Sequence, residues 1–138
     1  MNKISEVMTR EIQVARPDQT IREAAMMMAR GDIGSLPVGE NDKLVGMITD
    51  RDIAVRAVAE GRSPDTRVRE VMTDSIKYCY DDEDVERVAQ NMAELQVRRL
   101  PVVNRDKRLV GIVALSNVAQ CGDKKATAEM LRGVATPH

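Results

Sequence analysis

Apolar residues recur at the spacing of a buried helix face in two separate segments. In each segment they stand at positions i, i+3, i+4, i+7 and i+8, a pattern typical of an amphipathic helix. The first set is Ile21, Ala24, Ala25, Met28 and Ala29, and the second is Val85, Val88, Ala89, Met92 and Ala93. Thr20 and Glu23 form a capping-box pattern before the first helix, and Asp84 holds the equivalent cap position before the second.

Short apolar runs after each helix predict buried strands. The runs cover residues 36–38 and 44–49 after the first helix, and residues 100–103 and 109–114 after the second. Polar turns separate the two runs of each pair. Residues 50–60 then predict another helix that stops at Gly61, and residues 116–120 begin its counterpart. Each half of the chain is therefore predicted to run strand, helix, strand, strand, helix.

The two halves are copies of one unit. Glu6-Val7-Met8-Thr9 recurs as Glu70-Val71-Met72-Thr73, and Leu44-Val45-Gly46 recurs as Leu109-Val110-Gly111. We assign the first unit to residues 4–60, a linker to 61–67, the second unit to 68–120, and a fraying tail to 121–138. A unit of about 60 residues is marginally stable alone. We therefore expect an α/β (α+β) fold in which two β-α-β-β-α units pack with pseudo-twofold symmetry.

Composition and charge exclude several classes of function. The 138 residues are 43% hydrophobic and 31% charged, which is typical of a globular protein. Tyr78 and Tyr80 are the only aromatic residues, so a base-stacking platform for single-stranded nucleic acid is excluded. The net charge of −1 also argues against nucleic-acid binding. The apolar run at residues 24–29 is too short to span a membrane, and the N-terminus does not resemble a signal peptide. We expect a cytoplasmic protein.

Cysteine and histidine are too few for the usual metal and nucleophile sites. The chain has Cys79, Cys121 and a single histidine, His138, at its end. Structural zinc sites use four clustered Cys or His ligands, and serine or cysteine nucleophiles usually need a nearby histidine base. We therefore predict no metal site, no catalytic residues and no enzymatic activity. Both cysteines are expected to be free thiols.

The repeated motifs resemble a tandem pair of CBS domains, also called a Bateman module. They are Val7-Met8-Thr9, Ile33-Gly34-Ser35-Leu36-Pro37-Val38 and Gly46-Met47-Ile48-Thr49-Asp50-Arg51-Asp52, with Val97 to Val103 and Leu109 to Val113 in the second copy. The resemblance covers residues 4–118 and is to short standalone bacterial members. It implies a regulatory module, which we expect to be a homodimer joined through helix faces and to act on an unidentified protein. It also implies clefts between the two units for AMP, ADP, ATP or S-adenosylmethionine, with no required cofactor.

The resemblance implies two ligand clefts of unequal quality. The first copy keeps the family signature, in which a hydroxyl meets phosphate and a carboxylate meets ribose. Its implied ligand-binding residues are Thr49, Arg51, Asp52, Thr73, Val97, Arg98 and Arg99. The second copy has Ala114 and Asn117 in place of the hydroxyl and the carboxylate. Its weaker cleft would use Thr9, Ile33, Gly34, Ser35, Ile112, Ser116 and Asn117.

Structural interpretations stand beside these functional ones. Thr49 and Asp52 also fit an N-cap and a first-turn acid of a helix, with no ligand involved. The acidic run 81–84 fits the start of a helix better than a metal site, because it lacks the alternation and glycine of a calcium loop. The rival function is a protein-interaction or stress-response protein whose clefts bind no ligand.

Overall fold

The computed structural model describes residues 2–120, 128, 132 and 133, and it divides into two compact units. Unit 1 comprises Met1–Ile12 and Lys77–His138, and unit 2 comprises Gln13–Ile76. Unit 2 thus holds the body of the first sequence repeat, and unit 1 holds the body of the second. The predicted fraying of residues 121–138, and Cys121 with it, falls almost entirely outside the described residues.

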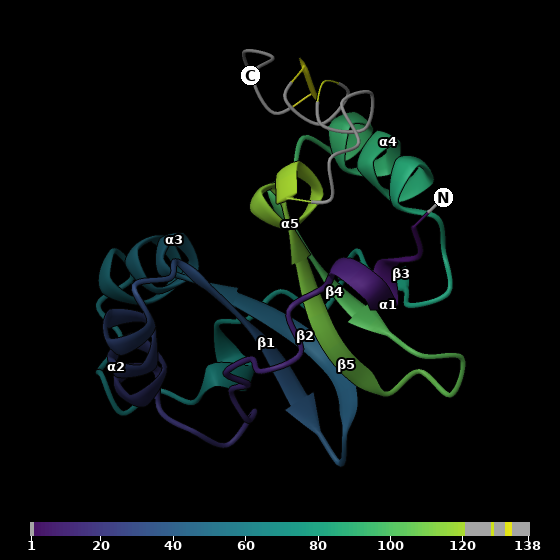
Figure 1. Ribbon diagram of the computed structural model, residues 1–138. Helices are drawn as coiled ribbons and strands as arrows, with labels where there is room; N and C mark the ends of the chain where they lie inside the picture. Colours follow the sequence, from purple (N-terminus) through teal and green to yellow (C-terminus); the bar gives the residue numbers. More distant parts are fainter. Residues whose placement is uncertain (1, 121–127, 129–131, 134–138) are drawn as a thin grey trace. The chain divides into compact units, whose positions relative to one another are not determined.

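Unit 2 is built on one antiparallel hairpin. Its elements are α2 (Ile21–Gly31), β1 (Ser35–Glu40), β2 (Lys43–Thr49), α3 (Asp50–Asp52), the π-helix η1 (Ile53–Val58) and the 3₁₀ helix η2 (Val68–Glu70). In the hairpin Leu36 is paired with Ile48. In Figure 1, α2 and α3 lie together on one side of the β1–β2 hairpin. Within the described part of this unit no strand precedes α2, and only an isolated bridge joins Ala15 to Val38.

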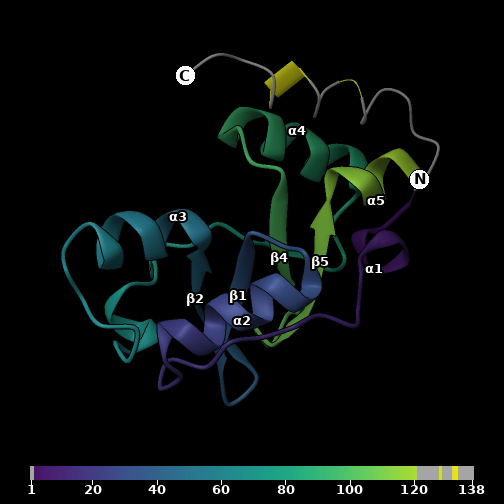
Figure 2. The ribbon, with the colours of Figure 1, turned by 90° about the vertical axis from the view of Figure 1, so that its left-hand side faces the viewer.

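Unit 1 repeats the order helix, strand, strand, helix, and its sheet has a third strand. Its elements are α1 (Ile4–Val7), β3 (Cys79–Tyr80), α4 (Val85–Leu95), β4 (Arg99–Val103), β5 (Leu109–Ala114) and α5 (Leu115–Gln120). Strand β3 pairs with β4 in parallel, and β4 pairs with β5 in antiparallel fashion. Figure 2 shows α4 and α5 together at one end of β4 and β5. The mixed α/β composition predicted from the apolar pattern is therefore confirmed.

The two predicted amphipathic helices form where the pattern placed them, and one of their two predicted caps differs. Thr20 caps α2 as predicted, since its Oγ1 accepts the Glu23 N–H at 3.1 Å. Asp84 stands at the N-cap of α4, but its described contacts include no capping bond to that helix. Its Oδ1 instead accepts a hydrogen bond from Lys3 Nζ at 2.8 Å, because a charged partner lies within reach.

The helix predicted over residues 50–60 is present, but only its first turn is α-helical and the rest is a π-helix. After α3 the backbone bonds reach five residues back, as in the Ala59 N–H to Ala54 carbonyl bond of 2.9 Å. Gly61 then ends the turn with φ of 73°, a value that suits glycine. Such π-segments are rare and occur frequently at functional sites.

Each unit has its own core, and each core includes the start of the other repeat. Ile4 and Met8 are buried among residues of unit 1, whereas Val68 and Val71 are buried among residues of unit 2. We call residues 4–9 and 68–73 the straps of unit 1 and unit 2, respectively. Each strap pairs with the second hairpin strand, β5 or β2, of a repeat to which it does not belong in sequence. No helix in the described part of the chain is long and apolar enough to traverse a bilayer.

Candidate functional site

The Gly46–Asp52 signature lies at the end of β2, where the strand turns into α3. Thr49 is extended, with φ of −118° and ψ of 162°, and it is the N-cap of α3. Its Oγ1 accepts the Asp52 N–H at 3.0 Å, while Asp52 Oδ2 accepts the Thr49 N–H at 3.0 Å. The two signature side chains thus form a reciprocal capping box, as the structural interpretation of the sequence expected.

Asp52 also faces a cation. Arg56 lies one helical turn further on, and its Nε is 3.9 Å from Asp52 Oδ1. Arg56 Nη1 lies 3.3 Å from each of the carbonyl oxygens of Val71 and Met72 in the strap. The Asp52 side chain is 15% exposed and that of Arg56 is 52% exposed. The carboxylate therefore links Thr49, at the end of β2, to the guanidinium that contacts the strap.

The strap of unit 2 runs directly beside the signature. Met47 and Thr73 exchange both backbone hydrogen bonds, at 2.9 and 2.8 Å. Gly46 makes this approach possible, because a Cβ there would lie 2.7 Å from Met72 Sδ and 2.9 Å from the Thr73 carbonyl oxygen. The signature glycine is thus explained by close packing of backbone against backbone.

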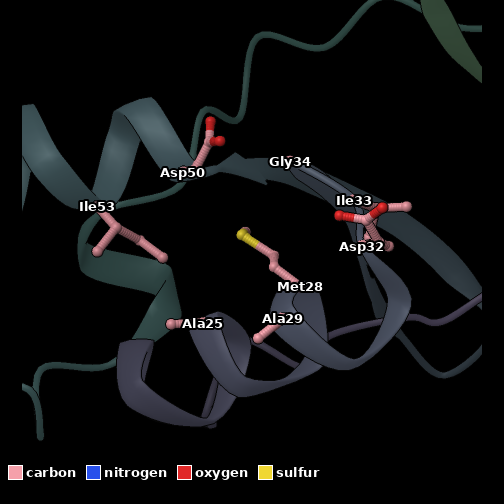
Figure 3. A pocket seen from close by; sticks show the side chains of 8 residues that line it. All are labelled: Ala25, Met28, Ala29, Asp32, Ile33, Gly34, Asp50 and Ile53. Carbon is pink, nitrogen blue, oxygen red and sulfur yellow. The ribbon is translucent and has the colours of Figure 1, made fainter.

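A pocket opens on the same unit between α2 and the start of α3 (Figure 3). Its volume is about 380 Å³, and its lining residues are Ala25, Met28, Ala29, Asp32, Ile33, Gly34, Asp50 and Ile53. The sulfur of Met28 points towards its centre, and the carboxylates of Asp32 and Asp50 stand at its edge (Figure 3). Asp50 N–H donates to the Gly34 carbonyl at 2.9 Å, which joins the two sides of the pocket. Neither Thr49 nor Asp52 is among its described lining residues.

Unit 1 repeats this layout with different side chains. Asn117 Oδ1 accepts the Ala114 N–H at 2.7 Å, as Asp52 does from Thr49. Asn117 Nδ2 donates to the Val7 carbonyl at 2.9 Å and to Thr9 Oγ1 at 3.2 Å. Thr9 and Ile112 exchange both backbone hydrogen bonds, at 2.8 and 3.0 Å, which matches the pair at Thr73.

The residues predicted for the first cleft are divided between the two units. Thr49, Arg51, Asp52 and Thr73 come together in unit 2, where the Arg51 side chain is exposed. Val97, Arg98 and Arg99 belong to unit 1, where the Arg98 carbonyl accepts the Leu115 N–H at 3.1 Å.

The set predicted for the second cleft is divided in the same way. Thr9, Ile112, Ser116 and Asn117 lie in unit 1, whereas Ile33, Gly34 and Ser35 lie in unit 2. Gly34 is close to Asp50 there, since a Cβ at Gly34 would be 2.9 Å from Asp50 Oδ2. Sequence reasoning also missed Arg56. Its signal was present, because Asp52 and Arg56 have the i, i+4 spacing of a helical ion pair.

Burial determines the chemistry of the cysteine thiol that the structure describes. Cys79 is buried, and its Sγ lies 3.9 Å from the Pro101 carbonyl oxygen. Burial, with smaller contributions from Glu83 and Asp81, raises the pKa of this thiol to about 12. Such a thiol is a poor nucleophile. Among the described residues no three His, Cys, Asp or Glu side chains gather as metal ligands.

Two proteins of known sequence are similar to this chain over most of its length. CBS domain-containing protein YhcV of Bacillus subtilis is 43% identical over 119 residues, covering 86% of this chain and 84% of YhcV. Hypoxic response protein 1 of Mycobacterium tuberculosis is 34% identical over 139 residues, covering 99% of this chain and 96% of that protein.

Solved structures agree with this likeness. The crystal structure of Hypoxic Response Protein I with two coordinated zinc ions matches with a TM-score of 0.78 and 36% identity, over 88% of this chain and 99% of that one. The CBS pair of MJ0100 with 5′-methylthioadenosine and S-adenosylmethionine matches with a TM-score of 0.75 and 30% identity, over 90% of this chain and 98% of that one. CBSX2 in complex with AMP matches with a TM-score of 0.76 and 26% identity, over 87% of this chain and 95% of CBSX2.

The CBS domain model matches residues 4–58 and again residues 68–121. These two matches cover most of the chain, and the motifs that they contain are the ones that form the straps, the hairpins and the capping box. The chain belongs to the CBS domain family and carries two CBS domains.

Proposed function

We propose that this protein is a non-enzymatic regulatory module that binds an adenine nucleotide or a related adenosyl ligand at the signature of its first CBS domain. The observation that carries the proposal is the pairing of Thr49 and Asp52 at the end of β2. Structural relatives in complexes with AMP, or with 5′-methylthioadenosine and S-adenosylmethionine, support the ligand class.

The two side chains keep the groups that such a ligand needs. The Thr49 hydroxyl accepts a bond from the Asp52 N–H, so its own proton remains to be donated to a phosphate oxygen. Asp52 uses Oδ2 for the Thr49 N–H, so Oδ1 and further lone pairs can accept the hydroxyl groups of a ribose. Arg51, exposed on the first turn, offers a cation for a phosphate tail.

Calorimetric titration with AMP, ATP and S-adenosylmethionine tests the proposal. We expect heat from at least one of them, and a loss of affinity of tenfold or more in Asp52→Ala. Thr49→Ala should weaken binding and also remove a helix cap. Thr20→Ala is its matched control, because Thr20 also caps a helix of unit 2 through a reciprocal capping box. No heat with any of the three ligands at millimolar concentration would contradict the proposal.

A ligand-free interaction or stress-response function is the second candidate. Two observations favour it. Thr49 and Asp52 already hydrogen-bond to each other's backbone N–H, and the second repeat has Ala114, which carries no hydroxyl, at the position of Thr49. The Thr49→Ala, Asp52→Ala double variant separates the candidates. Full partner binding and full cellular effect in that variant would favour the second one, whereas loss of both would favour nucleotide sensing.

We further propose that the protein is a cytoplasmic homodimer that regulates an unidentified protein. The helices of unit 2 expose apolar side chains suited to a dimer face: Met26 is 42%, Val55 47% and Val58 70% exposed. Light scattering after gel filtration should give twice the chain mass, and Val58→Asp should shift it towards the monomer. Cell fractionation tests the location.

A further inference from the structure

In both units a strap pairs with the second strand of the hairpin, but different side chains hold it in place. The straps correspond in sequence, since Val7, Met8 and Thr9 match Val71, Met72 and Thr73. Both are anchored by an exchanged pair of backbone bonds, Thr9 with Ile112 and Thr73 with Met47. The carbonyls of Val7, Val71 and Met72 accept their hydrogen bonds from side chains.

In unit 1 that donor is Asn117. Its amide bridges the first turn of α5 and the strap, because Oδ1 accepts the Ala114 N–H while Nδ2 donates to the Val7 carbonyl and to Thr9 Oγ1. The three distances are 2.7, 2.9 and 3.2 Å, respectively. Asn117 occupies the place that Asp52 has in the other copy. An uncharged amide here completes the strap contact without any ligand.

In unit 2 the corresponding residue cannot make this contact. Asp52 accepts the equivalent N–H, from Thr49, but an ionised carboxylate has no proton to donate to the Val71 carbonyl. Arg56 supplies the donor instead, with Nη1 3.3 Å from the carbonyl oxygens of both Val71 and Met72. Its Nε faces Asp52 Oδ1 at 3.9 Å. In the second repeat the residue at the Arg56 position is Cys121, which carries no guanidinium.

We propose that Arg56 is a positioning residue that holds the strap of unit 2 and orients Asp52, leaving its carboxylate available to a ligand, whereas Asn117 closes the equivalent position of unit 1. The ligand part rests on the proposed function, and it implies one adenosyl ligand per chain. The strap part concerns the ligand-free protein. The two parts are therefore tested by separate measurements.

Amide hydrogen exchange in the ligand-free protein tests the strap. Arg56→Met should speed exchange of the Thr73 N–H by about tenfold, as expected for loss of a charge-assisted hydrogen bond. Adding Asp52→Asn to that variant should restore slow exchange, because the new amide can donate to the Val71 carbonyl as Asn117 does to Val7. If Arg56 only filled space, Asp52→Asn would not restore the exchange rate.

The reciprocal change in unit 1 is the matched control. Asn117→Asp should speed exchange of the Thr9 N–H and leave Thr73 unchanged. Arg56→Lys, which keeps the charge and one donor direction, should lie between the wild type and Arg56→Met. Unchanged Thr73 exchange in Arg56→Met, or no rescue by Asp52→Asn, would overturn the assignment of Arg56.

Titration with AMP, ATP and S-adenosylmethionine tests the ligand part. We expect one site per chain, and a several-fold loss of affinity in Arg56→Met that does not add to the loss in Asp52→Asn. Two sites per chain would overturn the closure of unit 1 by Asn117. If the wild type binds none of the three, the proposed function fails, and the exchange measurements still decide whether Arg56 holds the strap.

Discussion

Gly111→Ala tests whether the signature glycines exist to let the straps approach. A Cβ at Gly111 would lie 2.7 Å from the Thr9 carbonyl oxygen and 2.8 Å from Met8 Sδ. The Met8 side chain can move, but the Thr9 carbonyl is fixed, because it accepts the Ile112 N–H at 3.0 Å. Gly111 has no positive φ, so the added methyl strains contacts and not the local backbone.

Two effects add up to the expected cost. Overpacking a close contact costs about 1–3 kcal/mol, and loosening the Thr9–Ile112 pair costs about 1 kcal/mol more, the net value of one hydrogen bond. We therefore expect the free energy of unfolding to fall by about 2–4 kcal/mol. Urea denaturation followed by circular dichroism measures this, and with a slope of about 2 kcal/mol/M the midpoint should fall by about 1–2 M.

Gly39→Ala is the control for the loss of a glycine from a strand of the same fold. Its Cβ would meet Val14 Cγ1 at 2.9 Å, and the nearest backbone atom, the Lys43 carbonyl oxygen, is 3.5 Å away. Val14 is 36% exposed and can turn aside, so the cost should stay below about 1 kcal/mol. Equal midpoints for the two variants, with unchanged exchange of the Ile112 amide, would refute the argument for close approach.

Three further outcomes follow from burial and charge. Cys79 should resist thiol reagents at pH 8 in the folded protein and react on unfolding, because burial raises its pKa to about 12. The folded state therefore binds the thiol proton more tightly than the unfolded state, so the contribution of Cys79 to the free energy of unfolding should decline from about pH 9 to pH 12. Cys79→Ala should flatten that part of the plot of stability against pH. Ile48→Ala should cost about 2–5 kcal/mol in chemical denaturation, because the Ile48 side chain is fully buried in the core of unit 2. Proton titration by NMR should find the pKa of Asp84 below its usual value, owing to its hydrogen bond and charge attraction with Lys3, and Lys3→Met should return it towards normal.

The elements that depend on local pattern could be predicted from sequence. The helix periodicity starting at Ile21 and Val85, the apolar strand runs and the Thr20–Glu23 capping box all involve neighbours within a few positions, and all appear in the structure. The duplicated motifs also identified the family, because their order is a property of the sequence itself.

The tertiary structure decided how the repeats share their segments. Both straps contain the sequence Glu-Val-Met-Thr, so the local sequence does not indicate which repeat each strap packs against. The structure shows Met8 buried in the core of the second repeat and Val71 buried in the core of the first. Asp84 likewise lost its capping role to Lys3, 81 positions away. The candidate site shows the same division. The sequence alone identified Thr49 and Asp52 as a pair. The role of Arg56 depends on the carbonyls of residues 71 and 72, which folding brings next to it. Contacts between segments far apart in the chain produce no periodic pattern in the sequence, so the sequence could not predict them.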